Sequence, residues 1–268
     1  TLKSLFPDTY RNYKLGDIRS KGITLDKLAT PMLSYDGRPA DNSHKIKAPA
    51  KAPMIVERVD AQEYSKGLSG RHIAVWQSHG RYYDVSSEKW EWQRPPLFQT
   101  VEDMFTQSFV LPYLVPMLEN AGAYVMLPRE RDTQVNEVIV DNDGQEIYQE
   151  VKSRKGKWKT ASTPGFAKKR NIYTDENPFK EGTARFAATE KKAEKAFAQW
   201  IPKIPETGRY AVYVSYQSLP ESVTDAKYLV FHKGGVTEFL VNQQMGGGTW
   251  VYLGTFEFDK GLNDYGMV

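Results

Sequence analysis

Four short runs near the C-terminus, in which apolar and polar residues alternate, limit the possible fold more than any other feature of the sequence. They are RYAVYVSYQS, AKYLVFHKGG, TEFLVNQQ and TWVYLGTFEF, and Pro or Gly residues separate them at Pro220, Gly234-Gly235, Gly246 to Gly248 and Gly261. Successive side chains of a strand point to opposite faces, so alternation gives each strand one face for a core and one for solvent. Short strands with turns at this spacing predict an antiparallel β-sandwich.

An earlier part of the chain has the pattern of an α/β layer. Ile73–Gln77 is apolar on both faces, as a buried sheet strand is, and Tyr124–Leu127 has the character of a second buried strand. Between them, Thr100 is a suitable N-cap for a helix whose apolar residues recur at helical spacing. Two prolines fall inside this helical pattern, so we expect a kink or a break near Val110.

These patterns divide the chain into three regions. Residues 1–67 lack sustained periodicity and are rich in Pro, Lys, Asp and Asn toward their middle, which predicts an extended N-terminal arm. Residues 68–135 form the α/β segment and residues 136–268 the sandwich. Residues 186–201 are ambiguous, because their Ala, Glu and Lys content favours a helix while their position favours a linker into strands. The predicted fold class is an α/β layer, incomplete in this chain, plus an antiparallel β-sandwich domain.

Composition and charge exclude several classes of protein. A net charge of +3 over 268 residues, without a dense run of Lys and Arg, argues against a nucleic-acid partner. The absence of cysteine excludes disulfides and thiolate ligands, so any metal must use His, Asp or Glu. No stretch reaches the roughly 20 apolar residues of a transmembrane segment. There is no signal peptide, but a chain that starts at Thr1 fits a processed or trimmed protein, so export stays open.

His79 and Glu102 are the leading candidates for function. His79 ends the first predicted strand and Glu102 lies in the first turn of the predicted helix, so both can converge at one edge of an open α/β sheet, where such sheets place their sites. Zinc hydrolases use three protein ligands and a water, so the pair is at most half of a zinc site. The alternative is a satisfied polar pair at a sheet edge.

The segment RYYDVSSEKWEWQRPPLF, directly after His79-Gly80, is a long aromatic loop. Long loops beside a site often form a binding wall, so Tyr82, Tyr83, Trp90 and Trp92 are candidates for contacting a substrate. The alternative is that these rings pack against the N-terminal arm.

The stretch IAVWQSHGR followed by TVEDMFTQSFVLPYLVPMLENAGAYVMLPRERD resembles the first half of zinc-dependent N-acetylmuramoyl-L-alanine amidases. Those enzymes have an apolar strand ending in His-Gly, a Glu that opens the next helix, and a Thr-Arg-x-x-Asp after the second strand. The resemblance implies that His79 and Glu102 are the first two zinc ligands. PRERD keeps the Arg and the Asp of the last motif, and we expect Arg129 and Asp132 to brace the strand end. Ser78, where a Gly is common, departs from the family.

The same resemblance implies a third ligand and a general base. In the family a second His lies on a later strand, and a Glu near the C-terminus of the domain acts as the base. After Asp132 the only histidine is His232, whose place in YLVFHKGG favours an ordinary strand residue beside a turn. We therefore expect the remaining ligand and the base outside this chain, and the chain alone to be inactive.

The C-terminal part is similar to the golvesin C-terminal-like module, a β-sandwich also found attached to xanthan lyases. The similarity lies in YAVYVSY, the HKGG turn, VNQ, GGGTW and LGTF. It implies that the sandwich is inserted into the amidase domain, so that the 268 residues are part of a longer or cleaved protein. The aromatic residues Tyr213, Tyr216, Trp250 and Tyr252 have the right chemistry for stacking on sugar rings, but alternation requires half of them in the core.

These resemblances lead to a functional hypothesis with alternatives. The hypothesis is a cell-wall hydrolase that cleaves the muramoyl–L-Ala amide with a zinc-activated water, located in the periplasm or secreted. Its partners would be peptidoglycan or another glycan, and the remaining C-terminal part of the same protein. One alternative is a non-catalytic carbohydrate- or envelope-binding protein, in which the α/β layer is a scaffold. A further alternative is a xanthan lyase-like polysaccharide enzyme, for which the sequence offers no base.

Overall fold

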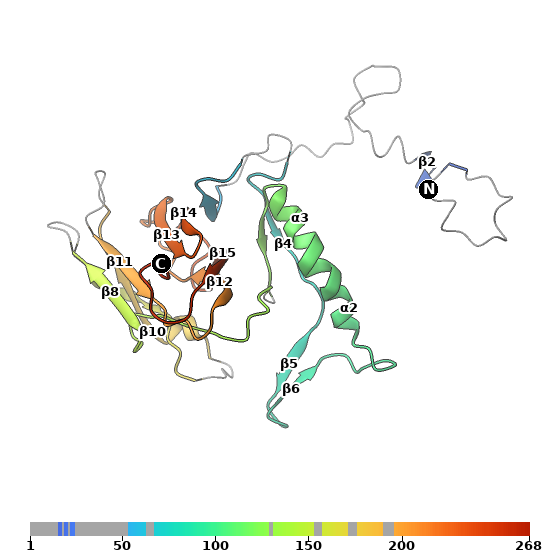
Figure 1. Ribbon diagram of the computed structural model, residues 1–268, viewed down its shortest axis with the longest axis horizontal. Coiled ribbons are helices and arrows are strands. Elements are labelled where there is room, and N and C mark those ends of the chain that lie inside the picture. The colour runs from blue at the N-terminus through green and yellow to red at the C-terminus, as the bar shows by residue number, and fades with distance from the viewer. Residues whose placement is uncertain are drawn as a thin grey trace, which may run out of the picture. The chain divides into compact units, whose positions relative to one another are not determined.

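A computed structural model of the chain describes residues 16–17, 19–20, 22–24, 53–62, 67–128, 131–152, 157–170, 176–189 and 196–268 (Figure 1). The chain divides into two compact units, Thr1–Ala50 and Lys51–Val268. In the first unit the strands β1 (Arg19–Ser20) and β2 (Ile23–Thr24) pair in antiparallel fashion. Most of the N-terminal arm predicted for residues 1–67 lies outside the described residues.

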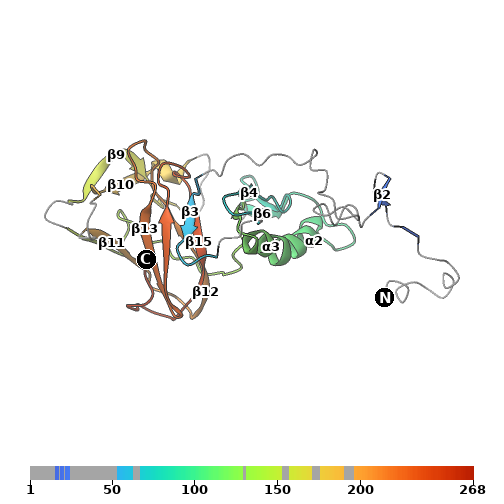
Figure 2. The same cartoon turned by 90° about the horizontal axis from the view of Figure 1, so that it is seen from above.

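Antiparallel strands dominate the second unit, and helices are few. β12 (Gly208–Val214) pairs with β15 (Val251–Phe258), and β13 (Ala226–His232) pairs with β14 (Gly235–Val241). β14 also pairs with β3 (Val56–Arg58), so this sheet includes a strand from the region predicted to be an arm (Figure 2). The four alternating runs therefore form the predicted antiparallel strands, consistent with a β-sandwich.

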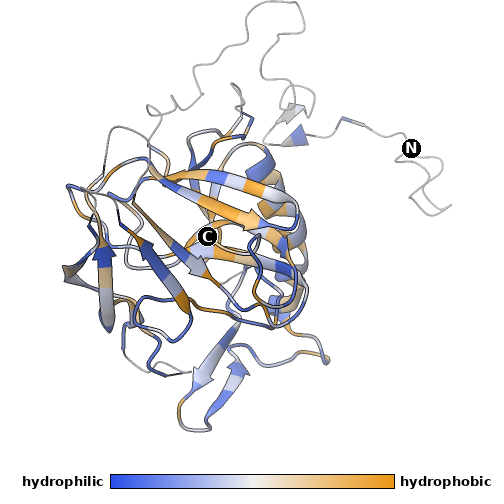
Figure 3. Ribbon diagram, turned by 60° about the vertical axis from the view of Figure 1, so that its left-hand side comes forward, coloured by the Kyte–Doolittle hydropathy of each residue, from blue (hydrophilic) through white to orange (hydrophobic). Residues whose placement is uncertain are grey.

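One hydrophobic core lies among these strands. Val230, Phe239 and Val241 have at most 2% of their surface exposed, and they come from the two neighbouring strands β13 and β14. Apolar and polar residues follow one another along the strands, as Figure 3 shows by colour. Removing such side chains from water stabilises the fold by about 1.5–3 kcal/mol each.

Two further antiparallel pairs belong to the same unit. β8 (Ile147–Val151) pairs with β11 (Phe197–Ile201), and β9 (Lys159–Gly165) pairs with β10 (Gly182–Phe186). A 3₁₀ turn, η4 (Pro178–Lys180), precedes β10.

The ambiguity of residues 186–201 is resolved in favour of strands at both ends. Phe186 ends β10, and Phe197 begins β11, while residues 190–195 between them lie outside the described residues. The helix suggested by composition is not found at the described positions, because pairing with β8 provides backbone hydrogen bonds that outweigh a weak helical propensity.

A β–α–β segment occupies residues 67–128. β4 (His72–Ala74) and β7 (Tyr124–Met126) are parallel neighbours, and Val75 adds one more backbone hydrogen bond to Met126. The helices α2 (Glu102–Phe109) and α3 (Val115–Asn120) connect them and lie alongside β4 in Figure 1. A parallel pair needs such a crossover, since its two strands start at the same end.

The predicted helix is interrupted where expected. A π-helical turn, η3 (Val110–Leu114), separates α2 from α3. Pro112 lies inside it and Pro116 just after it, and neither residue has the N–H that an α-helical hydrogen bond requires. The break near Val110 is confirmed.

Two details of this region correct the prediction. The N-cap is Val101, without a side-chain hydrogen bond, and not Thr100, because the backbone of Thr100 exchanges two hydrogen bonds with Leu97 across a tight turn. The first strand is shorter than Ile73–Gln77, and Trp76 is 67% exposed, so this strand is not buried on both faces among the described residues.

Every helix in the described part of the chain is too short or too polar to span a bilayer.

Candidate functional site

The structure brings His79 and Glu102 together. Nδ1 of His79 lies 3.7 Å from Oε1 of Glu102, and equally 3.7 Å from Oδ1 of Asp103. Glu102 is exposed, His79 is half-buried, and Asp103 is completely buried. The strand end and the first helical turn therefore converge at one point, as the sequence pattern predicts.

Asp103 is the residue of this group that the sequence reasoning did not select. Its Oδ1 accepts a hydrogen bond of 2.7 Å from the backbone N–H of Gly80. Burial by itself raises the pKa of this carboxyl, but hydrogen bonds from the Ser78 hydroxyl and from the backbone of Gly80 and His79 hold the pKa below its ordinary value. Asp103 is thus a buried anion that holds the Ser78–Gly80 turn.

That turn has an unusual backbone. Ser78 has a φ of +154° and Gly80 a φ of +71°, and the second value is one that glycine adopts without steric cost. Because this backbone cannot pair within a sheet, its N–H groups donate hydrogen bonds to the buried carboxylate of Asp103 instead. The backbone after His79 is therefore held by the helix that carries both acids. The acidic first turn of the helix, next to His-Gly, was the sequence signal for this role.

The group meets part of the requirement for zinc. Nδ1 of His79 is a buried atom without a hydrogen-bond partner, and it faces carboxylate oxygens, so a cation between them would find nitrogen and oxygen ligands that zinc accepts. Oδ1 of Asp103 is already engaged by Gly80. No group of three or more His, Asp or Glu suited to a metal occurs in the part of the chain that the structure describes. His79 and Glu102 therefore supply donor atoms of the kind zinc accepts, and their role as zinc ligands stays a prediction.

The predicted aromatic loop is a β-hairpin. β5 (Arg81–Asp84) pairs with β6 (Lys89–Trp92), with Tyr83 opposite Trp90 and Arg81 opposite Trp92. Tyr82 lies opposite Glu91, on the other face. Hence the four aromatic residues predicted as a wall do not share one surface.

The residues predicted to brace the end of the second strand are only partly described. Arg129 lies outside the described residues. Asp132 accepts hydrogen bonds from the backbone N–H groups of Gln134 and of Ala211 in β12, and not from β7, so its bracing of the second strand stays a prediction. Arg131, which was not selected from the sequence, forms an ion pair with Glu119. Its guanidinium lies over the ring of Tyr252.

His232 is a strand residue, as its sequence context favours. Its Nδ1 accepts a hydrogen bond from Gly234, its Nε2 lies 3.0 Å from Oγ1 of Thr237, and its ring stacks on Phe256. Of the aromatic residues considered for sugar stacking, Tyr213, Tyr216 and Tyr252 are half-buried. Trp250 is 39% exposed. Most of them therefore contribute to packing.

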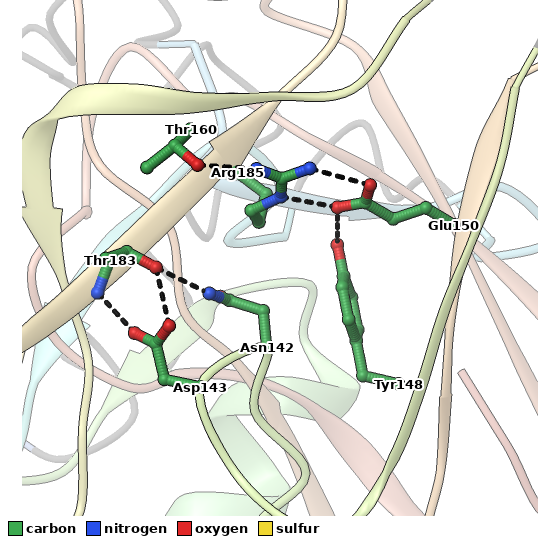
Figure 4. Close-up of a pocket in the computed structure, with 7 residues that line it drawn as sticks. All are labelled: Asn142, Asp143, Tyr148, Glu150, Thr160, Thr183 and Arg185. Atoms are coloured by element: carbon green, nitrogen blue, oxygen red, sulfur yellow. Dashed lines mark hydrogen bonds and ion pairs between the residues drawn. The ribbon is translucent and has the colours of Figure 1, made fainter.

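A polar pocket of about 370 Å³ lies within the sandwich region. It is lined by residues of the 142–143 turn, β8, β9 and β10, namely Asn142, Asp143, Tyr148, Glu150, Thr160, Thr183 and Arg185 (Figure 4). Sequence reasoning missed this site, because its residues come from four separate segments and match no motif.

An ion pair organises one side of the pocket. Nε and Nη2 of Arg185 donate to the two carboxylate oxygens of Glu150 at 2.6 and 2.8 Å, and the Tyr148 hydroxyl donates to the same carboxylate at 2.9 Å. The hydrogen bonds from Arg185 lower the pKa of Glu150, while burial and the Glu150 carboxylate raise the pKa of Tyr148. Arg185 and Glu150 therefore both stay charged at neutral pH, and their bidentate geometry fixes the orientation of the two side chains.

Thr183 organises the other side. Its Oγ1 donates to Asp143 at 2.7 Å and accepts from Nδ2 of Asn142 at 2.8 Å (Figure 4). The pocket thus presents fixed donors and acceptors on opposite walls, with the ring of Tyr148 packed against Trp200 beside them.

Comparisons with known proteins concern this half of the chain. Residues 138–266 match the family described as the Golvesin C-terminal domain. A 131-residue alignment, covering 48% of the chain, is 32% identical to a protein named xanthan lyase from Bacillus sp. (strain GL1), of which it covers 12%. A solved Paenibacillus xanthan lyase is similar over 49% of this chain and 12% of its own, with 25% identity and a TM-score of 0.36. The chain thus spans about an eighth of the length of the relatives it matches.

Proposed function

We propose that this protein binds polysaccharide through its β-sandwich, at the pocket between Glu150 and Thr183. The observation that carries the proposal is the polar pocket itself, which lies inside the region that matches the Golvesin C-terminal domain. The similarity of 131 residues of the chain to a protein named xanthan lyase supports a glycan as the ligand.

The chemistry of the lining suits sugar hydroxyls. A hydroxyl both donates and accepts, so it pairs best with a carboxylate and an amide or guanidinium placed side by side. The pocket offers Asp143 and Glu150 as acceptors and Asn142 and Arg185 as donors, each held by a neighbour. Because these groups are already oriented, little conformational entropy is lost when they bind.

The test is glycan binding by a variant that removes the central ion pair without leaving a lone charge. Glu150→Gln combined with Arg185→Met should abolish measurable binding of soluble xanthan and chitohexaose in titration calorimetry, while thermal unfolding stays cooperative. Lys233→Met is the matched control, since it breaks a more exposed ion pair, with Asp259, outside the pocket. Unchanged affinity in the double variant would exclude the pocket as the site.

A second function is supported by the convergence of His79 and Glu102. We propose that they are two ligands of a zinc site of the N-acetylmuramoyl-L-alanine amidase type, in a domain that a further segment completes and into which the sandwich is inserted. When bound, zinc would polarise the amide carbonyl and lower the pKa of a water to about 7. His79 and Glu102 hold the metal, Asp103 keeps His79 in place, and the base comes from the completing segment.

Zinc content and turnover test this second function. The protein together with its completing segment should hold about one zinc per molecule and hydrolyse peptidoglycan, and His79→Gln or Glu102→Gln should remove both properties. The 268 residues alone should show no turnover. Amidase activity of the chain by itself would refute the expected missing base.

A location outside the cytoplasm, in the periplasm or secreted, is part of both proposals, since glycan polymers are found there. A xanthan lyase-like activity has less support, because lyases need a base near a uronic acid and the sequence offers none.

A further inference from the structure

The hairpin β5–β6 has two chemically different faces. Cross-strand partners share a face, so the register places Arg81, Tyr83, Trp90 and Trp92 on one side. The other side carries Tyr82 and the charged residues Asp84, Lys89 and Glu91. We call the first side the aromatic face.

Contacts within the aromatic face orient its rings. Tyr83 and Trp90 meet edge to face with centroids 5.6 Å apart, and the guanidinium carbon of Arg81 lies 4.6 Å from the centroid of Trp92. Each contact fixes one rung of the hairpin. Trp90 is nevertheless 59% exposed, so its indole is the ring most available to a ligand.

The hairpin is anchored to the His79 group. The backbone N–H of Gln93 donates to the carbonyl of Gly80 at 3.0 Å, which continues the hairpin ladder to the residue after His79. Gly80 is in turn held by the buried carboxylate of Asp103. Trp90 lies three rungs from Gly80, or about 10 Å along the strand. Trp90 and the residue after His79 thus lie on one continuous hairpin.

We infer that the aromatic face is a second saccharide-binding surface, in which Trp90 stacks on a pyranose ring of a glycan chain whose next units reach toward His79. A pyranose with equatorial substituents presents a face of axial C–H groups, and these favour the electron-rich face of an indole. The inference takes only the class of partner from the proposed function.

The test uses ¹⁹F NMR of the full chain labelled with 5-fluorotryptophan, titrated with chitohexaose. The chain has six tryptophans, and a Trp90→Phe variant assigns the Trp90 signal. Trp90 reports on the hairpin, while Trp200 reports on the pocket, because Trp200 packs against the pocket residue Tyr148. The Trp90 signal should shift with increasing saccharide.

Affinity measurements on matched variants complete the test. Trp90→Ala should weaken chitohexaose binding at the hairpin about tenfold. Tyr82→Ala, which removes a 45% exposed ring from the opposite face of the same hairpin, should leave it unchanged. Equal losses in both variants would overturn the inference.

The titration tests the hairpin surface and the pocket independently. A shift of Trp200 without a shift of Trp90 overturns the hairpin surface and leaves the pocket in place. A shift of Trp90 alone supports the hairpin and excludes the pocket. If neither signal moves, the inference is wrong. If Trp90 is shielded from an added quencher such as iodide, the aromatic face is covered by the chain itself, and the inference is wrong for that reason.

Discussion

The β-sandwich and the β–α–β segment differ in how far their large apolar side chains are buried. In the sandwich, Phe239 is 2% exposed and lies in a continuous core of strand residues. In the β–α–β segment only Val115, Ala123 and Val125 are buried apolar residues of the local cluster, whereas Phe105 on helix α2 is 66% exposed. Met104, Phe109, Tyr113 and Met117 on the same helical run are also exposed.

The difference follows from what each pattern can bury by itself. An alternating antiparallel strand needs cover on one face only, and a second sheet of the same chain supplies it. A parallel strand needs cover on both faces, which one helical run cannot provide. A large exposed apolar surface on a soluble protein marks an interaction site. The strands β12–β15 thus share a continuous core, whereas the helical run of the β–α–β segment leaves an apolar face exposed among the described residues.

The strongest way to test this comparison is to remove a buried ring from the sandwich. Phe239→Ala should lower the free energy of unfolding by about 3–5 kcal/mol, since a cavity remains where the ring was. Urea unfolding followed by fluorescence measures the loss. If the cost were below about 1 kcal/mol, the core would be far looser than the burial of Phe239 indicates.

Asp103→Asn is expected to have the next largest effect, confined to the β–α–β segment. The amide keeps the shape of the side chain but weakens the charge-assisted hydrogen bonds to the Ser78–Gly80 turn, at a cost of about 1–3 kcal/mol. Hydrogen exchange should show faster exchange at Gly80, with the sandwich strands unaffected. Glu102→Gln, the exposed neighbour, is the control and should leave exchange unchanged.

The sequence predicted the sandwich strands well because alternation is a local property that burial enforces. It also predicted the break near Val110 and the approach of His79 to Glu102, since proline chemistry and strand-to-helix order are local as well. It did not predict the pocket, whose ion pair joins Glu150 to Arg185 across 35 positions of sequence. Nor did it predict the hairpin faces, because register depends on a turn without a Gly signal: Glu88 adopts a φ of +54° there.

Acid should weaken the sandwich through His232. Burial, and then the charge of Arg58, lower the pKa of this ring, and its Nδ1 accepts the Gly234 N–H only when it is unprotonated. A lowered pKa in the folded state means that stability is fully present above the unfolded value of about 6.5 and is lost as pH falls below it. Thermal unfolding between pH 7.5 and pH 5.5 (roughly one unit on each side of that value) should show this decline. His232→Gln should reduce the slope; an unchanged slope would assign the decline to other groups, such as the half-buried His72, whose pKa burial also lowers.

The smallest stability effect, and the most direct test of the uncovered helix, is expected for Phe105→Ser. The ring contacts Phe109 edge to face but is otherwise exposed, so its loss should change the free energy of unfolding by less than about 0.5 kcal/mol. Self-association, measured by analytical ultracentrifugation, should decrease because an apolar patch becomes smaller. Val115→Ala, a buried position on the same helical run, is the matched control and should destabilise clearly. If the two variants destabilised equally, the face would already be covered within this chain, and the contrast between the sandwich core and the exposed helical face would no longer hold.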